Sequence, residues 1–268
     1  MTDNTDALPL PAKPGVVWAL LLLAGLVFSG FLVLGIWQVQ RLQWKLALIE
    51  RIDQRVHAVP IAAPNRTLWP AINRESNEYS RVEVTGHFDH GREKLVRAST
   101  ELGSGFWVVT PMQTTTGFWV LVNRGFVSAE HSAQSSRPSS TENQTIVGLL
   151  RLTEPDGSFL QHNDVVANRW YSRDVQAIAT SVALDARPGA AATVATAPYF
   201  IDAAASPDVQ AWPRGGLTVL NFNNNHTVYA LTWFVLAAMV AGAAVYLLRS
   251  ERQLRASLAG GEPIDLRA

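Results

Sequence analysis

The residue with the clearest chemical potential is His226, which lies just before a long apolar stretch near the end of the chain. An apolar medium disfavours an ionisable side chain, so one at the edge of such a stretch is a candidate for a functional role. If a helix begins near Asn225, then His226, Tyr229 and Trp233 share one of its faces. An imidazole can bind iron axially, and the neighbouring rings and Ala230 can receive a flat apolar macrocycle. The spacing is therefore compatible with a site for an iron-containing cofactor.

The same residues also have a purely structural interpretation. The asparagines at 223–225 can cap the free N–H groups at the start of the helix. Tyr229 and Trp233 can belong to the belt of aromatic residues that forms where a helix leaves a membrane. The residues alone leave both interpretations open.

The element that must position His226 is a membrane-spanning helix, which the apolar run predicts over residues 229–248. Residues 16–36 form a second such run, interrupted only by Ser29. A run of about 21 residues at 1.5 Å each reaches roughly 30 Å, the thickness of a bilayer's hydrocarbon core. We therefore expect two spans, with the N-terminus (1–15) and the tail (249–268) on the same side of the membrane.

The charges near the spans suggest which side that is. The tail is rich in arginine, so the positive-inside rule makes it cytoplasmic. The bases between Arg41 and Arg55 argue the other way, although charge bias is a weak guide for long loops. The first fifteen residues contain two acids, Asp3 and Asp6, but only one base, Lys13. This composition does not suit a mitochondrial transit peptide, which is rich in arginine and poor in acidic residues. The prediction is a bacterial inner membrane protein with cytoplasmic termini and an exported, periplasmic domain over residues 37–228.

The segment between the spans is predicted to form a β-rich, antiparallel, barrel-like domain. From Tyr79 onward polar and apolar residues alternate with a period of two, which indicates a strand. Further strands, rich in β-branched and aromatic residues, are expected at 93–98, 106–112, 118–127, 145–152, 198–203 and 217–222. The residues at 114–117, Thr-Thr-Thr-Gly, can turn a hairpin. Helical spacing predicts that the first span continues through 38–56, and that 174–184 is a helix.

The composition and the absence of known motifs argue against several classes of function. The chain has no cysteine, which excludes disulfides and thiolate sites, and its 22 basic and 22 acidic residues give no nucleic-acid footprint. No nucleophile elbow, HExxH or phosphate loop is present. His87, Asp89 and His90 can ligate a metal, but they lie where a strand is expected to end, among residues that favour a solvated turn. The groups that a membrane-anchored enzyme would need are dispersed, at Glu154, His162, Asp164 and Asp174. We therefore predict that the protein is not an enzyme.

Several segments carry a recognisable pattern in a fixed order. The first is 35–45, Gly-Ile-Trp-Gln-Val-Gln-Arg-Leu-Gln-Trp-Lys, at the end of the first span. The others are 79–88, 120–127, 168–174, Asn-Asn-His at 224–226 and Tyr-Ala-Leu-Thr-Trp at 229–233. Together they resemble the Surfeit-locus family of cytochrome c oxidase assembly factors over nearly the whole chain. Phe126 and Ser128 depart from the tryptophan and proline that are usual there, which affects a turn and a ring.

The resemblance, to the heme a-binding bacterial type, implies a non-enzymatic function. Such a protein binds heme a and assists its delivery to the catalytic subunit of cytochrome c oxidase, with heme a synthase as a second partner. Carried over onto this sequence, the axial ligand of the heme iron is His226. The other residues of the predicted site are Trp37, Gln38, Arg41, Tyr229 and Trp233.

The contribution of the first span to this site depends on how the two spans pack. If they lie side by side, Trp37, Gln38 and Arg41 reach the same depth as His226, and Arg41 can pair with a heme propionate. Arg41 can equally be an interfacial anchor. The alternative function is a membrane scaffold that holds an oxidase assembly intermediate and contacts no heme.

Overall fold

The computed structural model describes residues 12–136, 140, 142–155, 157, 161–184, 194–208, 210–218 and 224–260. The chain divides into two compact units. One comprises Met1–Ile49 and Phe222–Ala268, and the other is Glu50–Asn221.

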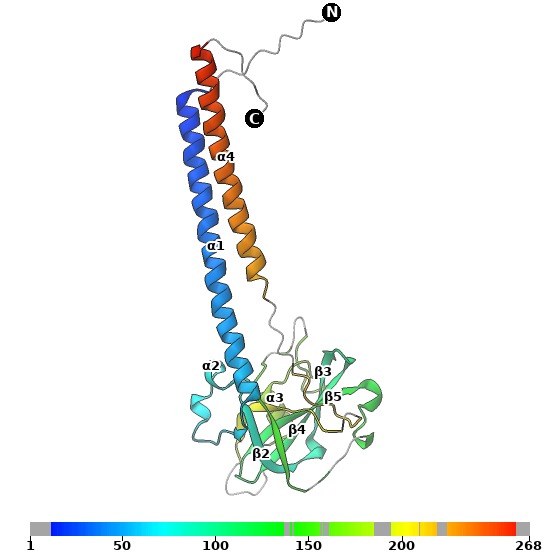
Figure 1. Ribbon diagram of the computed structural model, residues 1–268. Coiled ribbons are helices and arrows are strands. Elements are labelled where there is room, and N and C mark those ends of the chain that lie inside the picture. The colour runs from blue at the N-terminus through cyan, green and yellow to red at the C-terminus, as the bar shows by residue number, and fades with distance from the viewer. Residues whose placement is uncertain are drawn as a thin grey trace, which may run out of the picture. The chain divides into compact units, whose positions relative to one another are not determined.

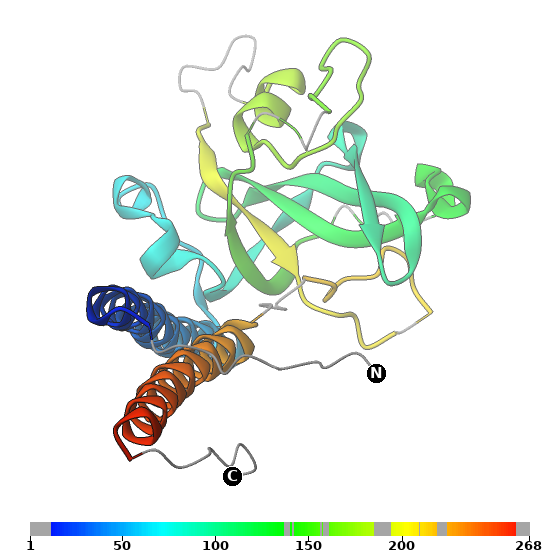
Figure 2. The ribbon, with the colours of Figure 1, turned by 90° about the horizontal axis from the view of Figure 1, so that it is seen from above.

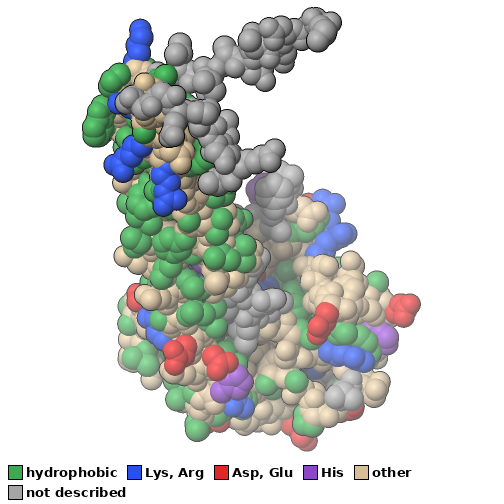
Figure 3. Space-filling view, turned by 45° about the horizontal axis from the view of Figure 1, so that its top comes forward, with side chains coloured by type: hydrophobic (Ala, Val, Ile, Leu, Met, Phe, Trp, Pro, Cys, Tyr) green, Lys and Arg blue, Asp and Glu red, His purple; other side chains and the backbone are tan. Residues whose placement is uncertain are grey.

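The first unit contains α4 (His226–Gly260) and most of α1 (Pro14–His57), whose last turns from Glu50 onward belong to the second unit; the two long helices run antiparallel beside each other (Figure 1). Both contain an apolar stretch long enough to cross a membrane, and the predicted spans 16–36 and 229–248 fall inside them. The expected continuation of the first span through residue 56 is confirmed. Large apolar side chains on both helices remain exposed (Figure 3). Such surfaces suit lipid, so the two helices indicate that the protein associates with a membrane.

The two helices approach each other closely at Gly35. A side-chain carbon at this position would lie 2.7 Å from the ring of Phe234 on α4, so only glycine leaves room for that ring. One turn away, the rings of Phe31 and Trp233 lie 5.6 Å apart. This contact brings the middle of α1 against the first turns of α4.

The second unit is a β-barrel with short helices around it. Its strands are β1 (Ile61–Ala62), β2 (Arg81–Phe88), β3 (Lys94–Thr100), β4 (Gly103–Thr114), β5 (Trp119–Ser128), β6 (Gln144–Leu152) and β7 (Thr196–Ala203). The α-helices between the strands are α2 (Arg74–Asn77) and α3 (Val175–Ser181). The sheet order is β1-β2-β6-β7-β5-β4-β3, and an additional β2–β4 pairing closes the five central strands into a barrel (Figures 1 and 2).

The barrel-like, β-rich prediction is confirmed, but the sheet is mixed rather than antiparallel. Within the barrel β5 and β7 pair in parallel, while the other described pairings of the ring are antiparallel. The alternation of residues predicts that a strand exists but not the direction of its neighbour. That direction depends on the long connection between β6 and β7, which inserts β7 beside β5.

Other differences from the prediction are local. The expected strand at 217–222 is wrong at 217–218, which are not in a strand, and 219–222 lie outside the described residues. The helix expected at 174–184 is shorter: Asp174 caps α3 by accepting from the Ala177 N–H, and Ala183 adopts a φ of 50° just beyond its end. A left-handed residue cannot continue a right-handed helix, so α3 ends before it.

The period of two in β2 places its apolar residues inside the barrel. Val82, Val84 and Phe88 are buried in a core cluster with residues from the other four strands of the ring. β5 is buried on both faces, because Trp119 and Leu121 pack outward into a second cluster that includes Ile178 of α3. A strand that is covered on both faces has apolar residues at successive positions, which explains the composition of β5.

Closure of the barrel depends on Gly86. This residue pairs with Thr114 of β4 and with Gln144 of β6, so two neighbouring strands meet there. A side-chain carbon on Gly86 would collide with the Gln113 carbonyl oxygen. Glycine therefore permits the close backbone approach by which β4 joins β2.

Candidate functional site

The helical unit brings His226 and Gln38 together. His226 is the first residue of α4, and its Nδ1 lies 2.7 Å from Oε1 of Gln38 on α1. An amide oxygen only accepts hydrogen bonds, so the imidazole Nδ1 donates and Nε2 carries the lone pair. No hydrogen-bond partner of Nε2 lies among the described residues. In its neutral form an imidazole that donates from Nδ1 is the tautomer that an Nε2 metal ligand requires.

Packing of the helices sets this distance. Gln38 lies one turn after Gly35, where α1 and α4 are in contact, and its side chain is only 8% exposed. An amide buried in an apolar contact needs a partner, and the imidazole of His226 provides it. We predicted that Gln38 lies near His226 on the condition that the two spans pack side by side. The functional role of the pair remains a prediction.

The aromatic residues of the predicted site differ in their surroundings. The ring of Trp233 packs on Phe31 of α1, so it takes part in the helix contact. Trp37 and Tyr229 are 52% and 54% exposed, which leaves their rings accessible for a flat apolar ligand or for lipid. Phe31 was not among the residues predicted for this site. An aromatic residue within an apolar run carries no local signal of its partner.

Arg41 is not brought to His226 by any described contact. Its guanidinium lies over the ring of Trp44, 4.1 Å from the ring centroid and three residues further along α1. A cation held over an aromatic face in this way remains able to bind an anion at its edge. The pairing of Arg41 with a propionate stays a prediction.

In the turn with His87, Asp89 and His90, considered as an alternative metal site, both ring nitrogens of His90 have protein partners. Nδ1 of His90 lies 3.3 Å from Nη1 of Arg124, which can only donate, so the imidazole accepts there and is neutral. Its Nε2 lies 3.2 Å from the carbonyl oxygen of Ser140, to which it donates. Within the described ranges, no group of three potential ligands is placed to hold a metal ion.

The surroundings of His90 predict a loss of stability in acid. Burial first, and then the Arg124 charge, hold the pKa of His90 below its ordinary value of 6.5, although Ser140, Glu93 and Asp89 act in the opposite direction. As pH falls below the ordinary pKa, the unfolded chain binds the proton first, so this part of the folding free energy is lost. Urea unfolding at pH 7.5 and pH 5 should therefore show a larger loss for the wild type than for His90→Gln. An equal loss in both proteins would contradict this assignment.

The barrel unit contains a buried charge cluster around Asp202 of β7. Its carboxylate accepts from Asn123 at 2.7 Å, from Arg173 at 2.9 Å and from Arg151 at 3.1 Å. The Thr218 hydroxyl donates to it as well, at 3.1 Å. Burial disfavours the charged form of Arg173, but Asp202 and Glu154 outweigh it and raise the pKa of this guanidinium. The cluster joins four distant segments of the chain by charge-assisted hydrogen bonds.

The acids that an enzyme would need have structural partners. Glu154 lies 2.6 Å from Arg173, and Asp164 lies 2.7 Å from Arg169. Asp174 caps α3. The described geometry does not gather these three carboxylates into one site.

Comparison with known proteins identifies close relatives of the chain. A model of the SURF1 family matches residues 25–238, a range that includes both Gln38 and His226. The chain is similar to Surfeit locus protein 1 of Mus musculus, with 35% identity over 255 residues, 88% of this chain and 77% of the mouse protein. Surfeit locus protein 1 of Homo sapiens is 33% identical over 242 residues, 82% of this chain and 73% of the human protein. A SURF1-like protein of Monosiga brevicollis is 32% identical over 263 residues, 92% and 93% of the two chains.

Proposed function

The chain belongs to the SURF1 family, the Surfeit-locus family of cytochrome c oxidase assembly factors, and from this premise we propose that it binds heme a and assists its delivery. In this proposal the recipient is the catalytic subunit of the oxidase, and heme a synthase is the source. The protein itself turns over no substrate.

The observation that supports the proposal best is the hydrogen bond between Gln38 and His226. It orients the imidazole and leaves its Nε2 without a described partner, and the neutral ring in this orientation is the form that binds iron. Heme a supplies the iron centre used by the oxidase for electron transfer and oxygen chemistry. The residues around His226 suit such a group, because the rings of Trp37 and Tyr229 are half exposed on otherwise apolar helices.

A delivery protein must release what it binds. The single imidazole at the start of α4 would hold the iron, and one such bond is easier to exchange than two. Trp37 and Tyr229 would contact the macrocycle, and Arg41 would meet a propionate with its charge. These contacts orient the cofactor while keeping it accessible to a recipient.

The proposed location follows from the same elements. We place the protein in a bacterial inner membrane with both termini in the cytoplasm and residues 37–228 in the periplasm. His226 and Gln38 would then lie near the outer leaflet. A cofactor with a large apolar surface can reach this depth from the lipid phase.

A second candidate function is supported by the same hydrogen bond. Two polar side chains that face each other between apolar helices satisfy one another, and the site then needs no ligand. In that case the protein is a membrane scaffold for an oxidase assembly intermediate and contacts no heme.

An absorption spectrum of the full chain distinguishes the two functions. The protein is purified from membranes that make heme a, and its fold is checked by tryptophan fluorescence. We expect a heme a spectrum that co-purifies with the protein. A well-folded protein without heme would contradict heme binding and favour the scaffold.

A further inference from the structure

The outer edge of β3 has backbone groups without a partner strand. In the sheet β3 pairs with β4 on one side only. The Arg97 N–H donates to the Trp170 carbonyl oxygen at 2.8 Å, so it points away from β4. Alternate residues of an antiparallel strand point the same way, which places the N–H and C=O of Ser99 outward as well. No backbone hydrogen bond among the described residues uses the outward groups of Ser99.

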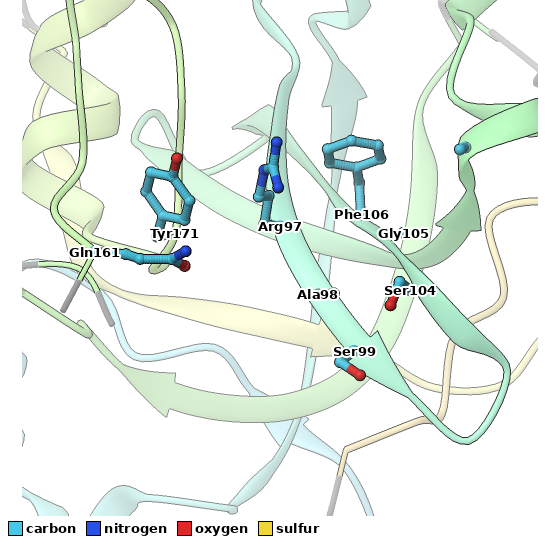
Figure 4. Close-up of a pocket in the computed structure, with 9 residues that line it drawn as sticks. Arg97, Ala98, Ser99, Ser104, Gly105, Phe106, Gln161 and Tyr171 are labelled. Carbon is cyan, nitrogen blue, oxygen red and sulfur yellow. The ribbon is translucent and has the colours of Figure 1, made fainter. Parts of the chain in front are cut away.

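A cavity of about 440 Å³ lies beside this edge. Figure 4 shows its residues: Arg97 and Phe106 stand next to each other, and Tyr171 and Gln161 lie across from β3. The register pairs Arg97 with Phe106, so their side chains share one face of the β3–β4 hairpin. The cavity therefore combines an open strand edge with an aromatic ring and a cation.

Arg97 differs from its arginine neighbours because it has no carboxylate partner in the described part of the chain. Arg169 lies 2.7 Å from Asp164, and Arg124 lies 3.7 Å from Glu93. No carboxylate of the described residues lies within 4.0 Å of the Arg97 guanidinium, which instead lies 5.7 Å from the ring centroid of Tyr171. An exposed guanidinium beside an aromatic ring is well suited to bind a carboxylate.

We propose that this cavity binds an extended, carboxylate-bearing segment of a partner protein. The segment adds to the β3 edge by hydrogen bonds with Ser99, and its carboxylate pairs with Arg97. Phe106 contacts a neighbouring apolar side chain of the segment. Trp170 already occupies the edge at Val96, so the guest pairs only with the end of β3 beyond that point.

The test uses two pools of short random peptides, one with glutamate fixed at the centre and one with lysine. The purified full chain captures peptides, and mass spectrometry counts those retained. We expect about tenfold more retention from the glutamate pool, as one charge-assisted hydrogen bond would provide. Arg97→Glu should abolish or reverse this preference.

Two further variants test the strand pairing. Ser99→Pro removes the outward N–H and is tolerated on an edge strand, whereas Ser99→Ala keeps that N–H. We expect Ser99→Pro to lower retention about tenfold and Ser99→Ala to leave it unchanged. Arg66→Glu, an exposed arginine outside the cavity, should have no effect.

Three results would overturn the proposal. The first is equal retention of both pools by the wild type, and the second is a preference that survives Arg97→Glu. The third is a loss with Arg97→Glu but not with Ser99→Pro, which would indicate a charge contact without strand pairing. Heme content should be the same in all these variants, so the outcome is independent of the proposed heme function.

Discussion

Replacing His226 with alanine is expected to remove the heme a that co-purifies with the full chain. The imidazole Nε2 provides the proposed bond to iron, and no second axial ligand is identified among the described residues. Contacts with Trp37 and Tyr229 would remain, but without the bond to iron we expect them to be too weak to retain the cofactor through purification. The measurement is the ratio of heme a absorbance to protein, with a fold check by tryptophan fluorescence.

Variants of Gln38 test whether its hydrogen bond to His226 contributes to heme binding. Gln38→Leu removes the acceptor for Nδ1, and loss of such a partner weakens metal affinity by about 10- to 100-fold. Gln38→Glu keeps an acceptor and makes the imidazole more basic, so it should retain heme and shift the spectrum. A role of Gln38 in packing alone would predict no spectral shift with Gln38→Glu.

His57→Ala serves as the matched control for His226. This exposed histidine lies at the end of α1 beside Asp53, and its loss should leave the heme content unchanged. If a folded His226→Ala protein kept the wild-type heme content, His226 would not be the ligand. If His57→Ala lost heme as well, the effect would reflect general damage to the protein.

Asp202→Ala is expected to lower the free energy of unfolding by about 3–5 kcal/mol, because it removes the buried carboxylate that pairs with two buried guanidinium groups. Asp202 is only 4% exposed and accepts from both Arg151 and Arg173. Glu154 still pairs with Arg173, but Arg151 loses its shortest ion pair. Asp202→Asn keeps an oxygen acceptor and should cost less than the alanine variant.

Urea unfolding of the full chain, followed by tryptophan fluorescence, measures this effect. Trp170 and Trp119 are buried in the cluster beneath α3, so their emission reports on the barrel unit. The control is Asp164→Ala, which removes an exposed ion pair with Arg169 and an exposed hydrogen bond from the Ala167 N–H, and should shift the unfolding midpoint much less. Equal shifts in the two variants would show that Asp202 has no special role.

Most elements could be predicted from the sequence because their signals are local. The apolar runs of α1 and α4 are recognisable from composition, and the alternation in β2 indicates which side of the strand is buried. The hairpin between β4 and β5 follows from the turn at 114–117, where Gly117 adopts a φ of 85°. The two residues of β1 are too few to show a period.

The site could be predicted only in part. His226 could be identified as a candidate functional residue because it is ionisable and lies directly before an apolar helix. Its hydrogen bond with Gln38 joins residues 188 positions apart, and it depends on Gly35 and Phe234 letting the helices meet. The sequence alone could suggest this pair only on the condition that the spans packed together.

The sequence by itself determined two apolar helices, a β-rich unit between them, and the family. Only the tertiary structure decided that β5 and β7 are parallel, that Asp202 accepts from donors of four segments, and that Arg97 has no carboxylate partner among the described residues. The physical reason is the range of the interactions. Secondary structure depends on neighbours a few residues away, whereas the partner of a buried charge or of a strand edge depends on which distant segments the fold brings together.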